Sequence, residues 1–124
     1  MDAMPPDDLP LVESTKLHRL CEVLGGEEGQ TFTRDLVARF EQSIEGRLAA
    51  AQRATDASDW QGLEAVAHAL KGAAATLGAV ALQEHAAGLE HLPEPAQAPE
   101  RLLRLRRVAA DTFTAFEIEL ARLG

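Results

Sequence analysis

The sequence has few aromatic residues, a single cysteine and no long apolar run. Aromatic residues make up 4% of the 124 residues, which favours close-packed helices of alanine and leucine over a sheet. Because Cys21 is the sole cysteine, no internal disulfide can form, and a lone thiol fits a reducing compartment. No apolar run approaches the roughly 20 residues of a transmembrane helix. The acidic, proline-containing residues 1–8 are unlike a secretory signal. We therefore expect a cytoplasmic protein.

Positive charge is also scarce. Lysine and arginine number 12 against 20 aspartates and glutamates, so the formal net charge at pH 7 is −8. A chain of this charge is repelled by nucleic-acid phosphates and by anionic membrane surfaces, so we expect neither as a partner. Hydrophobic residues make up 46% of the chain, enough for one domain with one core.

Apolar residues recur at helical spacing, and no stretch alternates as a strand would. The expected helices run from Ser14 (as N-cap) to Leu24, from about Glu28 to Ala54, from about Asp59 to Leu77, from about Val80 towards Leu92, and from about Glu100 to Leu123. Residues 1–12 are expected to form a flexible segment, and residues 93–99 a stiff proline-rich linker. The pattern predicts an all-α domain over residues 13–124, an antiparallel four-helix bundle with an additional short N-terminal helix at one end.

Two local details are predicted within these helices. The second helix should bury a stripe that starts at Phe32 and continues through Leu36, Phe40 and Ile44. Ser58 and Gln61 match a capping box at the start of the third helix, and Gly78 should end that helix.

One histidine of the expected third helix has unusual neighbours. Lys71 follows His68 by three positions and Gly72 by four, which puts all three on one helix face. This face lies away from the apolar stripe, so His68 is expected to face water beside Glu64 and Ala75. An exposed imidazole is largely neutral near neutral pH, and only an unprotonated ring nitrogen can attack phosphorus. A glycine inside a helix is costly, which suggests that its lack of a side chain has a purpose.

The second ring nitrogen of His68 needs a hydrogen-bond acceptor. If the third and fourth helices fold back at Gly78 and Ala79, residues 88–90 lie level with His68. Glu90 is the carboxylate in this window, so we expect it to accept a hydrogen bond from Nδ1 and to leave Nε2 as the nucleophile. Lys71 would offset phosphoryl charge, and Gly72 would let a partner come close.

Other polar residues have ordinary interpretations. His18, His85 and His91 are expected to be surface or packing residues, and their spacing with one cysteine does not support a zinc site. Four arginines on the last helix could form a solvated face or a docking surface for an acidic partner: Arg101, Arg104, Arg106 and Arg107.

The segment His68-Ala69-Leu70-Lys71-Gly72, followed by Leu77-Gly78-Ala79, Leu82 and Leu89-Glu90, resembles the histidine-containing phosphotransfer (HPt) domain of two-component phosphorelays. The resemblance is specific over residues 66–90, and the helix pattern extends it to about residues 13–123. It implies a four-helix bundle with His68 as the phosphoacceptor, Lys71 as its electrostatic companion, Gly72 as the clearance residue and Glu90 as the hydrogen-bond partner. Ala73 stands where the family often has serine.

The sequence therefore predicts a phosphocarrier, not an enzyme in its own right. It would exchange a phosphoryl group between His68 and aspartates of response-regulator receiver domains, with a histidine kinase or hybrid kinase as a further partner. No cofactor or metal is expected on this chain, because Mg²⁺ would belong to the receiver. The partner-binding residues would be Glu64, Gly72, Ala75 and Ala79, and the protein is expected to be a monomer. Two alternatives are a phosphoacceptor domain of a larger histidine kinase and a receiver-binding helical module that is not phosphorylated.

Overall fold

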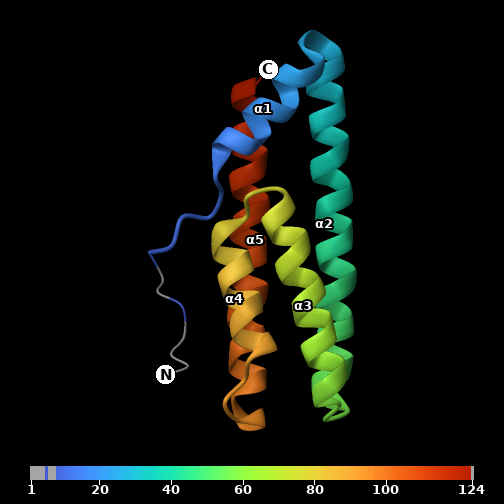
Figure 1. The fold of residues 1–124 in the computed structure, drawn as a ribbon, viewed down its shortest axis with the longest axis vertical. Coiled ribbons are helices and arrows are strands. Elements are labelled where there is room, and N and C mark those ends of the chain that lie inside the picture. Colours follow the sequence, from blue (N-terminus) through green and yellow to red (C-terminus); the bar gives the residue numbers. More distant parts are fainter. Residues whose placement is uncertain (1–4, 6–7, 124) are drawn as a thin grey trace.

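The computed structural model describes residue 5 and residues 8–123 of the chain, and its regular elements are all helical (Figure 1). In chain order they are α1 (Ser14–Leu24), α2 (Gly26–Asp56), α3 (Trp60–Thr76), α4 (Val80–Glu90), the short 3₁₀ helix η1 (Pro95–Gln97) and α5 (Ala98–Leu123). The predicted all-α class is confirmed. Among the described residues, no helix combines the length and apolar character needed to cross a membrane.

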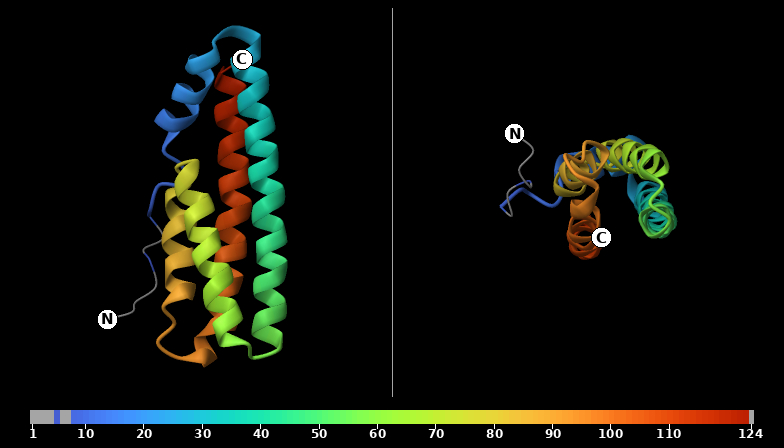
Figure 2. Two further views of the ribbon diagram at one scale, coloured as in Figure 1. Left: turned by 45° about the vertical axis from the view of Figure 1, so that its right-hand side comes forward. Right: turned by 90° about the horizontal axis from the view of Figure 1, so that it is seen from below.

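The helices α2, α3, α4 and α5 form an antiparallel bundle, and α1 lies across one end of it (Figure 2). The α3–α4 hairpin packs beside one half of the longer α2 and α5, and α1 takes its place beside the other half. Leucines and alanines fill most of the core, and Phe40 forms edge-to-face pairs with the buried Phe116 and with Phe113, which packs against the core. The short N-terminal helix thus covers core that the hairpin is too short to reach.

The buried face of α2 begins differently from the prediction. Phe32 is 44% exposed, and the buried positions in the first turns are Gly29, Thr33 and Val37. A Cβ atom added at Gly29 would lie 2.1 Å from the carbonyl oxygen of Cys21, so α1 packs directly on the backbone of α2 there. This close approach decides which face of α2 turns inward, and it places Phe32 outside the core.

Helix starts also differ from the predicted caps. The N-cap of α3 is Asp59, whose carboxylate accepts a hydrogen bond of 2.9 Å from the backbone of Gly62, whereas Ser58 has a φ of 53° and cannot act as the cap. Ser14 is the first residue of α1 and not its N-cap. The helix α5 begins at Ala98. Pro99 is accepted in its first turn, because the N–H that proline lacks would have no helical partner there.

The α3–α4 turn is held by the segment before α1 and by the first turn of α1. Gly78 has a φ of 72°, in the left-handed region that glycine favours, and its carbonyl accepts a hydrogen bond of 2.8 Å from the backbone of Glu13. The backbone of Ala81 donates to Pro10, and the ammonium of Lys16 donates to the carbonyl of Ala75 at 2.8 Å. Part of the expected flexible segment, residues 1–4 and 6–7, lies outside the described residues, and the boundary at residue 13 stays a prediction.

Candidate functional site

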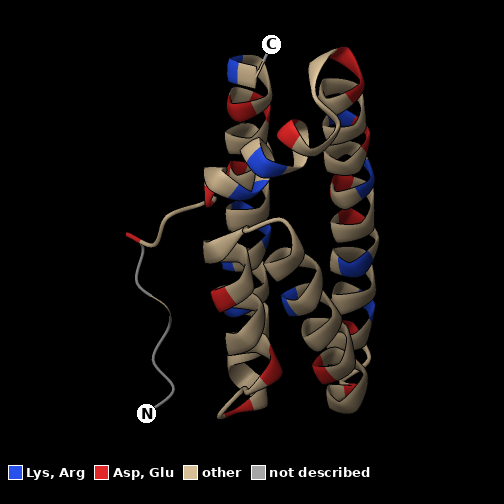
Figure 3. Ribbon diagram, turned by 45° about the horizontal axis from the view of Figure 1, so that its top comes forward, with Lys and Arg blue, Asp and Glu red and all other residues tan. Residues whose placement is uncertain are grey.

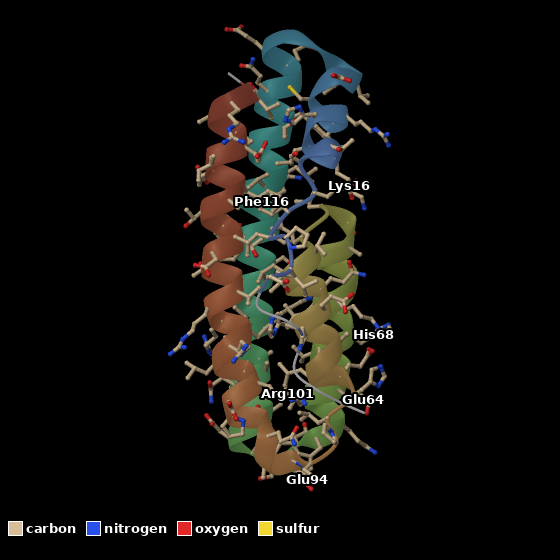
Figure 4. The ribbon with its side chains drawn as sticks, turned by 90° about the vertical axis from the view of Figure 1, so that its left-hand side faces the viewer. Lys16, Glu64, His68, Glu94, Arg101 and Phe116 are labelled. Atoms are coloured by element: carbon tan, nitrogen blue, oxygen red, sulfur yellow. The ribbon has the colours of Figure 1, made fainter. Side chains whose placement is uncertain are left out.

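His68 lies in the middle of α3 on the face turned away from the core. Leu63, Ala67 and Leu70 point inward from the same helix, which leaves the His68 side chain 74% exposed. Figure 4 shows the imidazole projecting outward on the same side of the molecule as Glu64 and Lys16. The periodicity of α3 alone accounts for this orientation. A ring nitrogen of His68 is therefore open to another molecule.

Glu90, the last residue of α4, faces His68 across the hairpin. Its Oε2 lies 2.5 Å from Nδ1 of His68, and its Oε1 accepts a hydrogen bond of 2.6 Å from the ammonium of Lys71. The Glu90 side chain is only 6% exposed, so these contacts replace most of its water. The hairpin thus brings together the three residues that sequence spacing had selected.

The charge of Glu90 fixes the proton on His68. The hydrogen bond from Lys71 lowers the pKa of Glu90 below its ordinary value, burial acts in the opposite direction, and the hydrogen bond with His68 lowers the pKa further. Glu90 is therefore ionised at neutral pH and can only accept hydrogen bonds. In the neutral ring, Nδ1 of His68 then carries the proton that Glu90 accepts, and the lone pair lies on Nε2.

A third side chain that can carry a positive charge, that of His91, contacts the same carboxylate, and the sequence did not single it out. Nε2 of His91 lies 3.0 Å from Oε1 of Glu90. His91 caps the end of α4 with φ −117° and ψ 53°, so the chain leaves the helix there and the ring reaches the neighbouring carboxylate. Its 71% exposure agrees with the expected surface location, and its position directly after Glu90 is the sequence signal for a contact that was not predicted.

The surface around His68 leaves room for a partner, but one of the four residues expected to line it is buried. A Cβ atom added at Gly72 would meet nothing within 4 Å, Glu64 is exposed, and Ala75 is partly exposed. Ala79 is 0% exposed, because the hairpin turns it into the core as the N-cap of α4. The inclusion of Ala79 in the partner-binding surface was therefore wrong.

A shallow hollow of about 140 Å³ lies next to the Glu90 end of the site. Its lining combines apolar and acidic side chains, namely Trp60, Glu64, Leu89, Glu90, Leu92 and Pro95. Within residues 8–123 and residue 5, no group of three or more histidine, cysteine, aspartate and glutamate side chains is arranged to hold a metal ion.

The arginines of α5 do not form one solvated face. Arg101 is buried and donates a hydrogen bond of 3.1 Å to the carbonyl of Gly88 in α4. Arg106 reaches towards α2, where it lies 3.4 Å from Oε1 of Gln52. Figure 3 shows acidic residues interspersed with basic ones along the helices. The interpretation of the four arginines as a single exposed surface was wrong, because two of them bridge helices.

Comparisons with known proteins agree with this geometry. The family model of the Hpt domain matches residues 35–124. The crystal structure of histidine-containing phosphotransfer protein B (HptB) from Pseudomonas aeruginosa PAO1 is similar, with a TM-score of 0.76 and 28% sequence identity. The match covers 93% of this chain and 98% of that one. Among curated protein sequences, no match was found.

Proposed function

This chain belongs to the Hpt domain family, and on that premise we propose that it is a histidine phosphotransfer protein in which His68 accepts the phosphoryl group. One observation carries the assignment to this residue. Its imidazole is 74% exposed, and its Nδ1 contacts the buried, ionised carboxylate of Glu90 at 2.5 Å. His85 is buried, and His18 and His91 lie closest to their carboxylates, Glu119 and Glu90, through Nε2 and not through Nδ1.

The transfer requires only a nucleophile on this chain. The lone pair of Nε2 attacks phosphorus of an aspartyl phosphate on a receiver domain, an N–P bond forms, and the P–O bond to the aspartate breaks to release its carboxylate. The proton stays on Nδ1, so the ring gains positive charge as the bond forms. Glu90, held opposite that proton, stabilises the charged ring, and the reverse steps return the phosphoryl group to an aspartate.

Lys71 and Gly72 serve the incoming group. The Lys71 ammonium lies one helical turn from His68 and offsets charge on the phosphoryl oxygens. Gly72 has no side chain that could obstruct an approaching receiver domain, and Glu64 and Ala75 lie beside the path of approach. Mg²⁺ and the acidic pocket that holds it would come from the receiver. The chain then acts as a phosphocarrier and not as an enzyme.

The proposed partners are response-regulator receiver domains and a histidine kinase or hybrid kinase that supplies the phosphoryl group. We propose that the protein acts as a monomer in the cytoplasm. The alternative of a receiver-binding module without phosphorylation has no observation of its own in its favour, and the following experiment separates the two.

The test incubates the protein with a receiver domain that carries a radiolabelled aspartyl phosphate. We expect acid-labile, base-stable label on the wild-type chain and none on His68→Gln. His18→Gln is the matched control, because His18 is also exposed but lies on α1 beside Glu119. Equal labelling of His68→Gln would refute the assignment. Receiver binding without any label transfer would favour the alternative module.

A further inference from the structure

His91 is the contact of Glu90 that the proposed transfer leaves unused. Oε1 of Glu90 lies 2.6 Å from the Lys71 ammonium and 3.0 Å from Nε2 of His91, while Oε2 lies 2.5 Å from Nδ1 of His68. The His91 ring is 71% exposed, whereas the carboxylate that it contacts is 6% exposed. Burial of its own ring therefore does not explain why His91 is held there.

Oε2 of Glu90 stays on Nδ1 of His68 only if a hydrogen-bond donor also holds Oε1 of the same carboxylate. A carboxylate turns about the bond that joins it to its side chain, and a buried oxygen without a donor is costly. In the phosphorylated protein, the phosphoryl group on Nε2 of His68 competes with Glu90 for the Lys71 ammonium, because the phosphoryl oxygens carry more charge than the Glu90 carboxylate does. Oε1 would then lose its shorter contact at the stage when the ring is most positive.

We propose that His91 is a positioning residue that donates its Nε2–H to Oε1 of Glu90 and keeps Oε2 on Nδ1 of His68 when Lys71 turns to the phosphoryl group. This role rests on the proposed function of His68. The contact forms with either the neutral Nε2–H form or the protonated form of His91, since both donate from Nε2. The backbone N–H of His91 donates to the carbonyl of Ala87 at 3.1 Å, which anchors the residue at the helix end.

According to the proposal, either Lys71 or His91 alone can hold Oε1 of Glu90. The ring nitrogen that carries the proton on His68 shows whether at least one of them does so. Long-range proton–nitrogen NMR spectra of the full chain, labelled with ¹⁵N in histidine, give the ratio of Nδ1–H to Nε2–H forms of the His68 ring. The variants are Lys71→Ala, His91→Leu and the double variant. Lys71→Ala imitates the state in which the ammonium has left Glu90.

We expect both single variants to keep the wild-type ratio and the double variant to lower it about tenfold, the scale of one charge-assisted hydrogen bond. Adding His91→Gln to Lys71→Ala restores the ratio, because glutamine has an N–H donor that leucine lacks. Loss of the ratio in Lys71→Ala alone, or an unchanged ratio in the double variant, would overturn the proposal. His18→Leu is the matched control, since that ring lies on α1 and contacts Glu119.

This readout is separate from phosphotransfer itself, because it is taken on the unphosphorylated protein. If the wild-type chain accepts no label from any receiver, the proposed function fails whatever the NMR ratio shows. If label is accepted but the double variant keeps the wild-type ratio, only the role of His91 fails. A helical circular dichroism spectrum equal to that of the wild type excludes misfolding of the variants as the cause.

Discussion

Nδ1 of His68 and Oε2 of Glu90 lie 2.5 Å apart, although 22 positions separate the two residues in the chain. The α3–α4 hairpin creates this contact, since its turn at Gly78 sets the two residues level on neighbouring helices. The contact makes the two ring nitrogens of His68 unequal. In the proposed function, Nδ1 holds the proton and Nε2 accepts the phosphoryl group.

Removal of the Glu90 carboxylate should slow the transfer. Glu90→Ala takes away the acceptor that stabilises the positive ring, and we expect the rate of phosphoryl transfer from a receiver to fall about 10- to 100-fold, the value of one hydrogen bond to a charged group. Glu90→Gln keeps an acceptor oxygen and should lose less. Single-turnover transfer kinetics measure both, and Glu94→Ala, in the exposed segment after α4, is the control. A wild-type rate in Glu90→Ala would contradict the role of this residue.

The same carboxylate should contribute stability that depends on pH. Its pKa is lowered in the folded protein from an ordinary value of 4.5, so the unfolded chain binds the proton more readily as the pH falls. The contribution is therefore complete above pH 4.5 and is lost as the pH drops through the lower folded value. Urea unfolding should show Glu90→Gln less stable than the wild type at pH 7, with a smaller difference at pH 3. A stability difference between the two proteins that grows towards pH 3 would contradict the lowered pKa of Glu90.

Gly72 and Gly46 allow a matched test of clearance. Both lie inside helices, and a Cβ atom at either would meet nothing within 4 Å. Gly72→Gln and Gly46→Gln should each stabilise the fold by about 0.5–1 kcal/mol, because glycine is a poor helix former. Only Gly72→Gln should reduce the transfer rate, by about tenfold or more, since its side chain stands beside His68 on the approach path. Thermal unfolding and transfer assays together test the pair, and equal transfer rates would refute the clearance role.

Glu41 on α2 should destabilise the folded protein at neutral pH. Burial raises its pKa, and the negative charges of Glu117 and Glu45 raise it further. A raised pKa means that the folded chain holds the proton more tightly, so stability falls as the pH rises from 4.5 through the folded value. Glu41→Gln should be more stable than the wild type in urea at pH 7 and should lose this advantage towards pH 4. Glu22→Gln, on the exposed side of α1, should show no such gain.

Much of the fold and site could be predicted from local spacing. The outward orientation of His68, with Lys71 and Gly72 on its face, follows from about 3.6 residues per helical turn. The pairing with Glu90 follows from counting away from a tight turn at Gly78. These relationships depend only on residues joined by a few turns of helix, so the sequence contains them directly.

Contacts between segments far apart in the chain were decided by the tertiary structure alone. Phe32 is exposed because α1 packs on the backbone at Gly29, and Arg101 is buried because it reaches a carbonyl of α4. The sequence by itself determined the helices and the exposed imidazole, since helical periodicity is local. Close packing of distant segments decided which side chains surround that imidazole, because packing depends on distances that no local spacing contains.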